Sequence, residues 1–208
     1  MELMGRDMEI VRCVFRFRFT LGRHIRELAG FSSSRSADRR LRTLIMGGYL
    51  ERKKYLYGLP YLYTLTHKGR MLIGANKRKD KIRLDRIAHD IFLLDTVIYF
   101  IKKHNISLDD IESEKELHIK DGFSGRKHHP DFVFSLNNKN NKKYAVEVEL
   151  NPKTKSNLEK NIRSNYMNYD RQIWITNDKK VFAMLSSFKE VYSNLEIIDL
   201  GEILDYVK

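Results

Sequence analysis

The segment HHPDFVFSLNNKNNKKYAVEVEL, residues 128–150, constrains the fold more strongly than any other part of the chain. In its second half, YAVEVEL, side chains alternate, so a strand there presents its valines on one face and Glu147 and Glu149 on the other. The polar run NNKNNKK between the two halves is typical of a turn. The segment therefore predicts a β-hairpin with one buried, apolar face.

The apolar residues also predict the register of this hairpin. If the chain turns within KNN at residues 139–141, the phenylalanines of DFVF lie opposite the valines of VEVEL, with Phe132 across from Val148. Asp131 then lies beside Glu149 and diagonal to Glu147. A shift of one residue would turn the phenylalanines to the wrong face. The pattern therefore predicts a cluster of three carboxylates.

Three carboxylates on one face repel each other, so the cluster needs either raised pKa values or a cation. Mg²⁺ or Mn²⁺, which prefer oxygen ligands, would meet that need. The alternative is a solvated polar face, because half-exposed sheets commonly show this alternation. Two features favour the metal: the face is purely acidic, and the lysines of NPKTK follow it closely.

At these residues the chain resembles the PD-(D/E)xK nuclease superfamily. That family has an Asp at the start of one strand and Glu-x-Lys on the next. The matching segments here are PD at residues 130–131 and EVE at residues 147–149. Glu149 therefore stands where the pattern has Lys. The resemblance implies a metal ion that polarises the scissile phosphate and lowers the pKa of the attacking water.

The resemblance also implies roles for particular residues. Asp131 and Glu147 would bind the metal, with Glu114 of the preceding ESEKEL as a further ligand and Glu112 and Glu116 as its alternatives. Glu149, or a lysine at position 153 or 155, would orient the attacking water, and a lysine would also stabilise the charge on the phosphate. The catalytic residues implied in this way are Asp131, Glu147, Glu149, Lys153 and Lys155.

The charge of the chain is unevenly distributed. Residues 1–83 hold 20 Lys and Arg against 7 Asp and Glu, a net +13, whereas residues 84–208 hold 19 against 20, a net −1. This asymmetry indicates a module that binds a polyanion, joined to a different module. The basic residues do not follow one amphipathic helix with a broad apolar face, so a membrane partner is disfavoured.

The basic part has the order of a winged helix. Residues 5–20 and 21–30 predict two helices, and SSSRSADRRLRTLIMGG predicts a third that turns Leu41, Leu44 and Ile45 inward and leaves its arginines on the outer surface. Two strand-like runs follow, linked near residues 58–60. The order and the motifs GGYLERK and YTLTHKGRMLI resemble winged-helix DNA-binding proteins over residues 8–75, in which a Thr-x-x-Gly turn opens the next helix.

The winged-helix resemblance implies double-stranded DNA as the partner. The third helix, residues 36–46, would enter the major groove, and the strands would form a wing that reaches the backbone or the minor groove. The DNA-binding residues implied are Arg35, Arg39, Arg40, Arg42, Lys53, Lys54, Tyr55 and Tyr57. A protein-interaction module is the alternative, and the +13 charge favours DNA.

The remaining sequence predicts a second domain. The charged run ANKRKDKIR, residues 75–83, marks the join, so we expect domains at residues 1–80 and 81–208. The amphipathic helix DRIAHDIFLLDTVIYFIKKH, the hairpin, a helix in KSNLEKNIRSNYMNY and a strand in RQIWITND give the αβββαβ order of a restriction-endonuclease-like fold, in an α/β (α+β) chain. His128 and His129 are not expected to form a zinc site, because neighbouring side chains of a strand point in opposite directions. We expect them to line the mouth of the cleft of this domain instead.

The order of landmarks across the chain gives a more specific resemblance. A winged helix followed by AHDIFLLD, ESEKEL, HPDFVF and VEVEL is similar to the plasmid replication-relaxation family and to MobC-type plasmid relaxases. The resemblance implies a metal-dependent nickase of a mobile element that recognises an origin-like site, with other relaxosome or replication proteins as partners. The alternatives are a non-catalytic accessory protein or repressor with a vestigial nuclease fold, and an end-cleaving transposition nuclease.

The sequence also bears on the compartment. Its apolar runs are all shorter than the ~20 residues of a membrane span, and the first residues lack the apolar run of a signal peptide. A single cysteine, Cys13, excludes an intramolecular disulfide. We therefore expect a bacterial cytoplasmic protein that is not attached to a membrane.

Overall fold

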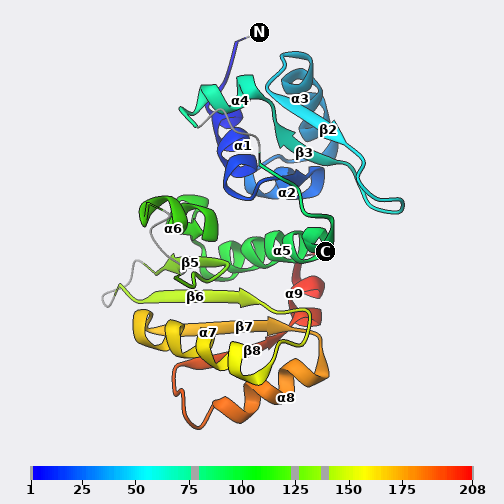
Figure 1. Ribbon diagram of the computed structural model, residues 1–208. Coiled ribbons are helices and arrows are strands. Elements are labelled where there is room, and N and C mark those ends of the chain that lie inside the picture. The colour runs from blue at the N-terminus through cyan, green and yellow to red at the C-terminus, as the bar shows by residue number, and fades with distance from the viewer. Residues whose placement is uncertain (1, 76–79, 123–126, 137–140, 208) are drawn as a thin grey trace. The chain divides into compact units, whose positions relative to one another are not determined.

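Four helices and a small sheet make up the first part of the computed structural model, which describes residues 2–75, 80–122, 127–136 and 141–207 (Figure 1). The sheet is antiparallel, with strand order β1-β3-β2. The elements are α1 (Gly5–Arg16), β1 (Thr20–Leu21), α2 (Gly22–Leu28), α3 (Ser34–Met46), β2 (Leu50–Lys53), β3 (Leu62–Leu65) and α4 (His67–Leu72). The three predicted helices and two predicted strands are thus confirmed, with α1 ending four residues early.

The third helix is fixed at its start and along its inner side. The hydroxyl oxygen of Ser33 accepts a hydrogen bond from the backbone N–H of Ser36, a typical N-cap contact. Leu41 and Leu44 are buried against apolar residues of α1 and α2, as predicted, and Ile45 is half-buried at the edge of the same cluster. One face of α3 is therefore committed to the core.

The predicted Thr-x-x-Gly turn opens α4. Thr66 is its N-cap: the hydroxyl accepts the N–H of Gly69 at 3.1 Å and donates to the carbonyl oxygen of Gly48 at 2.6 Å. Gly69 packs so tightly that a Cβ atom there would overlap the carbonyl oxygen of Tyr49. The glycine is therefore required by close backbone approach.

The chain divides into two compact units, one up to Leu94 and one from Asp95 onward. The boundary falls inside α5 (Ile87–His104), not at residue 80 as predicted from composition. The start of α5 belongs to the first unit because Ile87 and Ile91 are buried in an apolar cluster with Phe19, Leu21 and Leu62. The predicted join at residues 75–83 lies partly outside the described residues.

The second unit is built on a mixed five-stranded sheet of order β4-β5-β6-β7-β8. The β4–β5 and β5–β6 pairs are antiparallel, and β6–β7 and β7–β8 are parallel. The elements after α5 are β4 (Ile111–Ser113), α6 (Glu114–Lys120), β5 (Phe132–Ser135), β6 (Lys143–Val148), α7 (Lys155–Asn168), β7 (Arg171–Thr176), α8 (Lys179–Phe188), β8 (Leu195–Asp199) and α9 (Leu200–Val207). Short 3₁₀ turns precede α5 and β4, at Leu84–Arg86 and Leu108–Asp110.

Helices cover both faces of this sheet (Figure 1). Phe100 of α5 packs against Phe132 and Phe134 of β5, with ring centroids 6.1 and 5.1 Å apart. On the opposite face, Trp174 of β7 is buried with apolar residues of α7 and α8, among them Leu158. The chain is therefore a mixed α/β protein in which the predicted hairpin, β5–β6, lies at the centre of a sheet.

The register of the hairpin differs from the predicted one. Phe132 pairs with Val146 rather than Val148, and Phe134 pairs with Tyr144. The two aromatic rings stack with centroids 4.8 Å apart and an interplanar angle of 6°, a contact that favours this register. A two-residue shift leaves each side chain on its predicted face, because side chains alternate with period two. It changes which residues are neighbours across the strands.

Among the described residues, no helix has both the length and the apolar character needed to cross a bilayer.

Candidate functional site

Asp131 and Glu147 form the centre of the candidate site. Asp131 directly precedes β5 and Glu147 lies near the end of β6, on the face opposite the phenylalanines. A carboxylate oxygen of Asp131 accepts the backbone N–H of Val148 at 2.8 Å, which ties the start of one strand to the end of the other. Both carboxyl groups are buried, with 8% and 6% of each residue exposed. The observed register therefore places Asp131 opposite Glu147. The prediction that Asp131 lies beside Glu149 is wrong.

Two side chains hold the carboxyl group of Glu147. His128 Nε2 lies 2.7 Å from Oε1, and Asn165 of α7 donates its side-chain N–H to the same oxygen at 3.0 Å. The pKa of Glu147 is raised, mainly because burial disfavours its charge, and further by repulsion from Asp131. The contacts with His128 and Asn165 oppose that rise without cancelling it.

Glu149 belongs to a second pair. Its backbone N–H donates to the carbonyl oxygen of Ile175 at 2.8 Å, so the chain follows β7 just beyond the end of β6. Its carboxylate forms an ion pair with Lys153, four residues on. Of the two lysines predicted from the sequence, Lys153 is the one that contacts Glu149. Lys155 instead lies over the ring of Phe188, with 5.5 Å from Nζ to the centroid.

Glu114 reaches the site through its backbone. Its N–H donates to the carbonyl oxygen of Asp131 at 2.9 Å, while its carboxylate lies 3.8 Å from His118, one turn along α6. Of the predicted alternatives, Glu112 pairs with Lys120 at 2.8 Å and Glu116 completes the N-terminal cap of α6. The acidic residues around α6 therefore all have structural partners.

Further residues join the site that the sequence patterns did not select. Asn165 is 1% exposed, and no hydrogen-bond partner for its Oδ1 is found in the described part of the chain. The pKa of Tyr169 rises to about 12, first through burial and then through Glu147 and other nearby carboxylates. His128 was predicted only to line the cleft mouth, and its place just before Pro-Asp was the available sequence clue. Nothing in the sequence of α7 marked Asn165.

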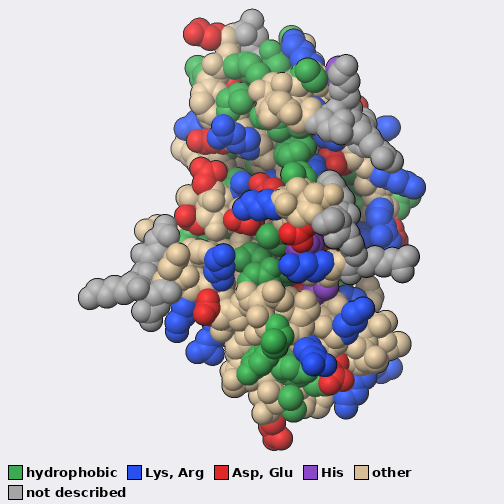
Figure 2. Space-filling model, turned by 60° about the vertical axis from the view of Figure 1, so that its left-hand side comes forward, with side chains coloured by type: hydrophobic (Ala, Val, Ile, Leu, Met, Phe, Trp, Pro, Cys, Tyr) green, Lys and Arg blue, Asp and Glu red, His purple; other side chains and the backbone are tan. Residues whose placement is uncertain are grey.

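The neighbouring histidines form a second contact group. His129 Nε2 lies 2.9 Å from a carboxylate oxygen of Asp121, and its ring meets that of His118 edge-on with centroids 4.6 Å apart. Burial and the nearby His118 lower the pKa of His129, in that order. Figure 2 shows histidine side chains reaching one face of the molecule among acidic and basic ones.

Asp131 and Glu147 suit a hard divalent cation as two oxygen ligands. Burial first, and repulsion from Asp131 after it, raise the pKa of Glu147, and a nearby cation would favour its charged form. Mg²⁺ usually keeps several waters and takes one or two protein carboxylates beside phosphate oxygens. Within the described residues, no group of three or more His, Cys, Asp or Glu side chains is arranged to hold a metal ion. The three-carboxylate cluster predicted from the sequence is thus reduced to a pair.

The arginines of α3 divide into two sets. Arg35, Arg39 and Arg42 are exposed, as predicted. Arg40 is instead directed into the unit, where it forms an ion pair with the buried Asp7 of α1. Burial opposes the charge of Asp7, but hydrogen bonds from Arg40 and from the Met4 backbone dominate and lower its pKa. Arg40 is therefore a structural residue, which corrects its predicted place on the outer surface.

The predicted wing residues also divide. Lys53 at the end of β2, and Lys54 and Tyr57 in the β2–β3 connection, are exposed. Tyr55 is half-buried and packs against the apolar cluster that contains Phe19. Its ring is thus an anchor of the loop rather than an exposed contact.

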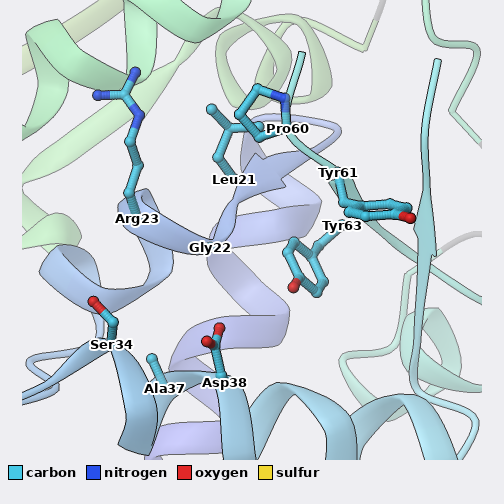
Figure 3. A pocket seen from close by; sticks show the side chains of 9 residues that line it. All are labelled: Leu21, Gly22, Arg23, Ser34, Ala37, Asp38, Pro60, Tyr61 and Tyr63. Carbon is cyan, nitrogen blue, oxygen red and sulfur yellow. The ribbon is translucent and has the colours of Figure 1, made fainter. Parts of the chain in front are cut away.

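A hollow of about 310 Å³ lies between α3, the start of α2 and the start of β3 (Figure 3). Tyr61 and Tyr63 line one side of it and Asp38 of α3 lines another. Arg52 lies over the ring of Tyr61, 4.5 Å from the centroid. The complete lining is Leu21, Gly22, Arg23, Ser34, Ala37, Asp38, Pro60, Tyr61 and Tyr63.

Comparison of the chain with known proteins found no match to a family model, a curated protein or a solved structure.

Proposed function

We propose that this protein is a DNA-binding, metal-dependent nicking endonuclease, with a winged helix joined to a PD-(D/E)xK-like domain. The observation that carries the proposal is the buried Asp131–Glu147 pair, formed where β5 begins and β6 ends. The order α5, β4, β5, β6, α7, β7, with α6 inserted after β4, agrees with the αβββαβ order of that superfamily. By the same resemblance, the substrate would be an origin-like duplex site of a mobile element.

In this proposal the carboxylate pair holds Mg²⁺ or Mn²⁺, which would polarise the scissile phosphate and supply an activated water. The Val148 N–H fixes the orientation of Asp131. His128 and Asn165 both contact Oε1 of Glu147, so Oε2 is the oxygen that we assign to the cation. These contacts set the carboxylate before the substrate arrives.

Lys153 would supply the positive charge that the motif lysine provides in the superfamily. It pairs with Glu149, the residue that corresponds to the motif lysine in the resemblance, and this contact supports the assignment. A lysine there stabilises the negative charge that develops on the phosphate. The exposed arginines of α3 would recruit the duplex through its phosphates.

The decisive experiment incubates the purified chain with supercoiled plasmid and Mg²⁺ or Mn²⁺ and follows conversion to the nicked form. We expect metal-dependent nicking that falls by about 100-fold or more in Asp131→Asn and in Glu147→Gln. DNA affinity should be unchanged in both variants. Lys155→Ala is the matched control and should nick normally, because that lysine packs on Phe188.

A second candidate is a DNA-binding protein whose nuclease-like domain no longer cleaves, such as a relaxosome accessory factor or a repressor. It is favoured by the lack of a three-ligand metal group in the described residues and by the engagement of Glu147 with His128 and Asn165. Calorimetry with Mn²⁺ separates the two. DNA binding without metal binding or nicking would establish the second candidate and overturn the first.

A further inference from the structure

The connection between β2 and β3 presents an apolar tip. It extends away from the helices of the first unit (Figure 1). Tyr57 is fully exposed and its neighbour Leu56 is 40% exposed. Gly58 follows with a positive φ of 82°, a conformation that favours glycine and reverses the chain at the tip. Two adjacent large apolar side chains are thus displayed to solvent at the end of a hairpin.

The tip is held from both sides. Tyr55 and Leu59, which flank it, are half-buried and pack against the apolar cluster that contains Phe19 and Leu62. The packing of these two residues therefore fixes both ends of the exposed segment between them. A contact surface that is already ordered loses less conformational freedom when a partner binds. This arrangement differs from a solvated loop, in which neither flank would be fixed.

The flank of the tip is basic. Arg52, Lys53 and Lys54 precede it and are exposed, and the ammonium of Lys54 lies 5.4 Å from the ring centroid of Tyr57. Positive charge beside an exposed apolar wedge is complementary to a groove of duplex DNA, whose phosphates attract the lysines while its base steps accept the ring. A protein partner with an apolar pocket would not require the three cations.

We propose that Leu56 and Tyr57 form a wedge that enters the minor groove and partly unstacks one base step. The inference rests on the DNA-binding part of the proposed function and adds an activity to it: local distortion of the duplex. Pyrimidine–purine steps unstack at the lowest cost, so TA-rich DNA is the expected preference. Lys53 and Lys54 would hold the flanking phosphates.

The structure offers a reporter for this contact. Trp174 is the chain's one tryptophan and is fully buried, so acrylamide reaches it poorly. Tyr57→Trp places a second, exposed indole at the tip. Without DNA, we expect acrylamide to quench the fluorescence of this variant strongly. On a TA-rich duplex of about 40 base pairs, we expect the new indole to be clearly protected from quenching. Phe182→Trp, at a half-exposed position of α8 in the other unit, is the matched control and should show no protection.

Permanganate reactivity of thymines on the same duplex reads the DNA side. Saturating full-length protein should create hyperreactive thymines. Tyr57→Ala should abolish them and weaken binding by about tenfold, within the range for loss of a base-stacking aromatic. Tyr57→Phe should retain them, because the ring is kept. Lys54→Ala should weaken binding and reduce its salt dependence but retain hyperreactivity at saturation.

The outcomes separate the two proposals. If the protein binds the duplex but the introduced indole stays quenched and no thymine becomes hyperreactive, the wedge is wrong and DNA binding stands. If Tyr57→Ala keeps the hyperreactive thymines, another element distorts the DNA and the wedge is again wrong. If the protein fails to bind duplex DNA at low salt, the proposed function fails, and the wedge fails with it.

Discussion

Gly69 shows at the residue scale how one backbone contact joins two parts of the first unit. Its Cα lies against the carbonyl oxygen of Tyr49, which a Cβ atom would overlap. We expect Gly69→Ala to destabilise the chain by about 1–3 kcal/mol, because backbone cannot move aside as a side chain can. Gly5→Ala is the control: nothing lies within 4 Å of its Cβ, and alanine favours the helix. Urea unfolding measures both, and equal midpoints would contradict the close approach.

Glu147 gives a second prediction at the residue scale. Burial and Asp131 raise its pKa in the folded protein, so its ionisation opposes folding. Stability from this residue is greatest below its unfolded pKa of about 4.3 and declines as the pH rises through the folded value. In the absence of divalent ions, Glu147→Gln should therefore be more stable than wild type at pH 7, and the difference should vanish near pH 4. A variant less stable at pH 7 would refute this sign.

The helix α3 shows at the element scale how two faces carry two tasks. Arg39 is exposed, whereas Arg40 neutralises the buried Asp7. Arg39→Ala should leave stability unchanged, weaken duplex binding and reduce the slope of log affinity against log salt by about 0.9 if one phosphate contact is lost. Arg40→Ala should cost about 3 kcal/mol of stability, because it leaves a buried charge unpaired. Salt titration of DNA binding and urea unfolding of both variants test this division of tasks. A loss of stability in Arg39→Ala, with unchanged stability in Arg40→Ala, would exclude it.

The division of the whole molecule predicts which fragment folds. The apolar cluster of the first unit includes Ile87 and Ile91, beyond the predicted boundary at residue 80. A fragment of residues 1–94 should fold and bind duplex DNA with strong salt dependence, since residues 1–83 carry the net charge of +13. A fragment of residues 1–83 should unfold more easily because it lacks both isoleucines. Circular dichroism melts and mobility shifts compare the two, and equal stability would show that α5 adds nothing to this unit.

The sequence by itself determined the local structure and the facing of side chains. Period-two alternation in YAVEVEL predicted β6 and put Glu147 on the face opposite the valines, and helical spacing predicted α1 and α3. The Thr66 cap and Gly69 were readable because a short-range contact joins them. These features depend only on residues a few positions apart, so a sequence pattern specifies them.

The tertiary structure alone decided which residues meet. The stacking of Phe134 on Tyr144 accompanies a register two residues from the predicted one, and Asp131 consequently pairs with Glu147 rather than Glu149. Asn165 reaches Glu147 from α7, and Arg40 finds Asp7 33 positions away. Alternation fixes the face of a strand but not its neighbour, because a two-residue shift preserves every facing. Packing between distant elements selects the partner, and no local pattern records that choice.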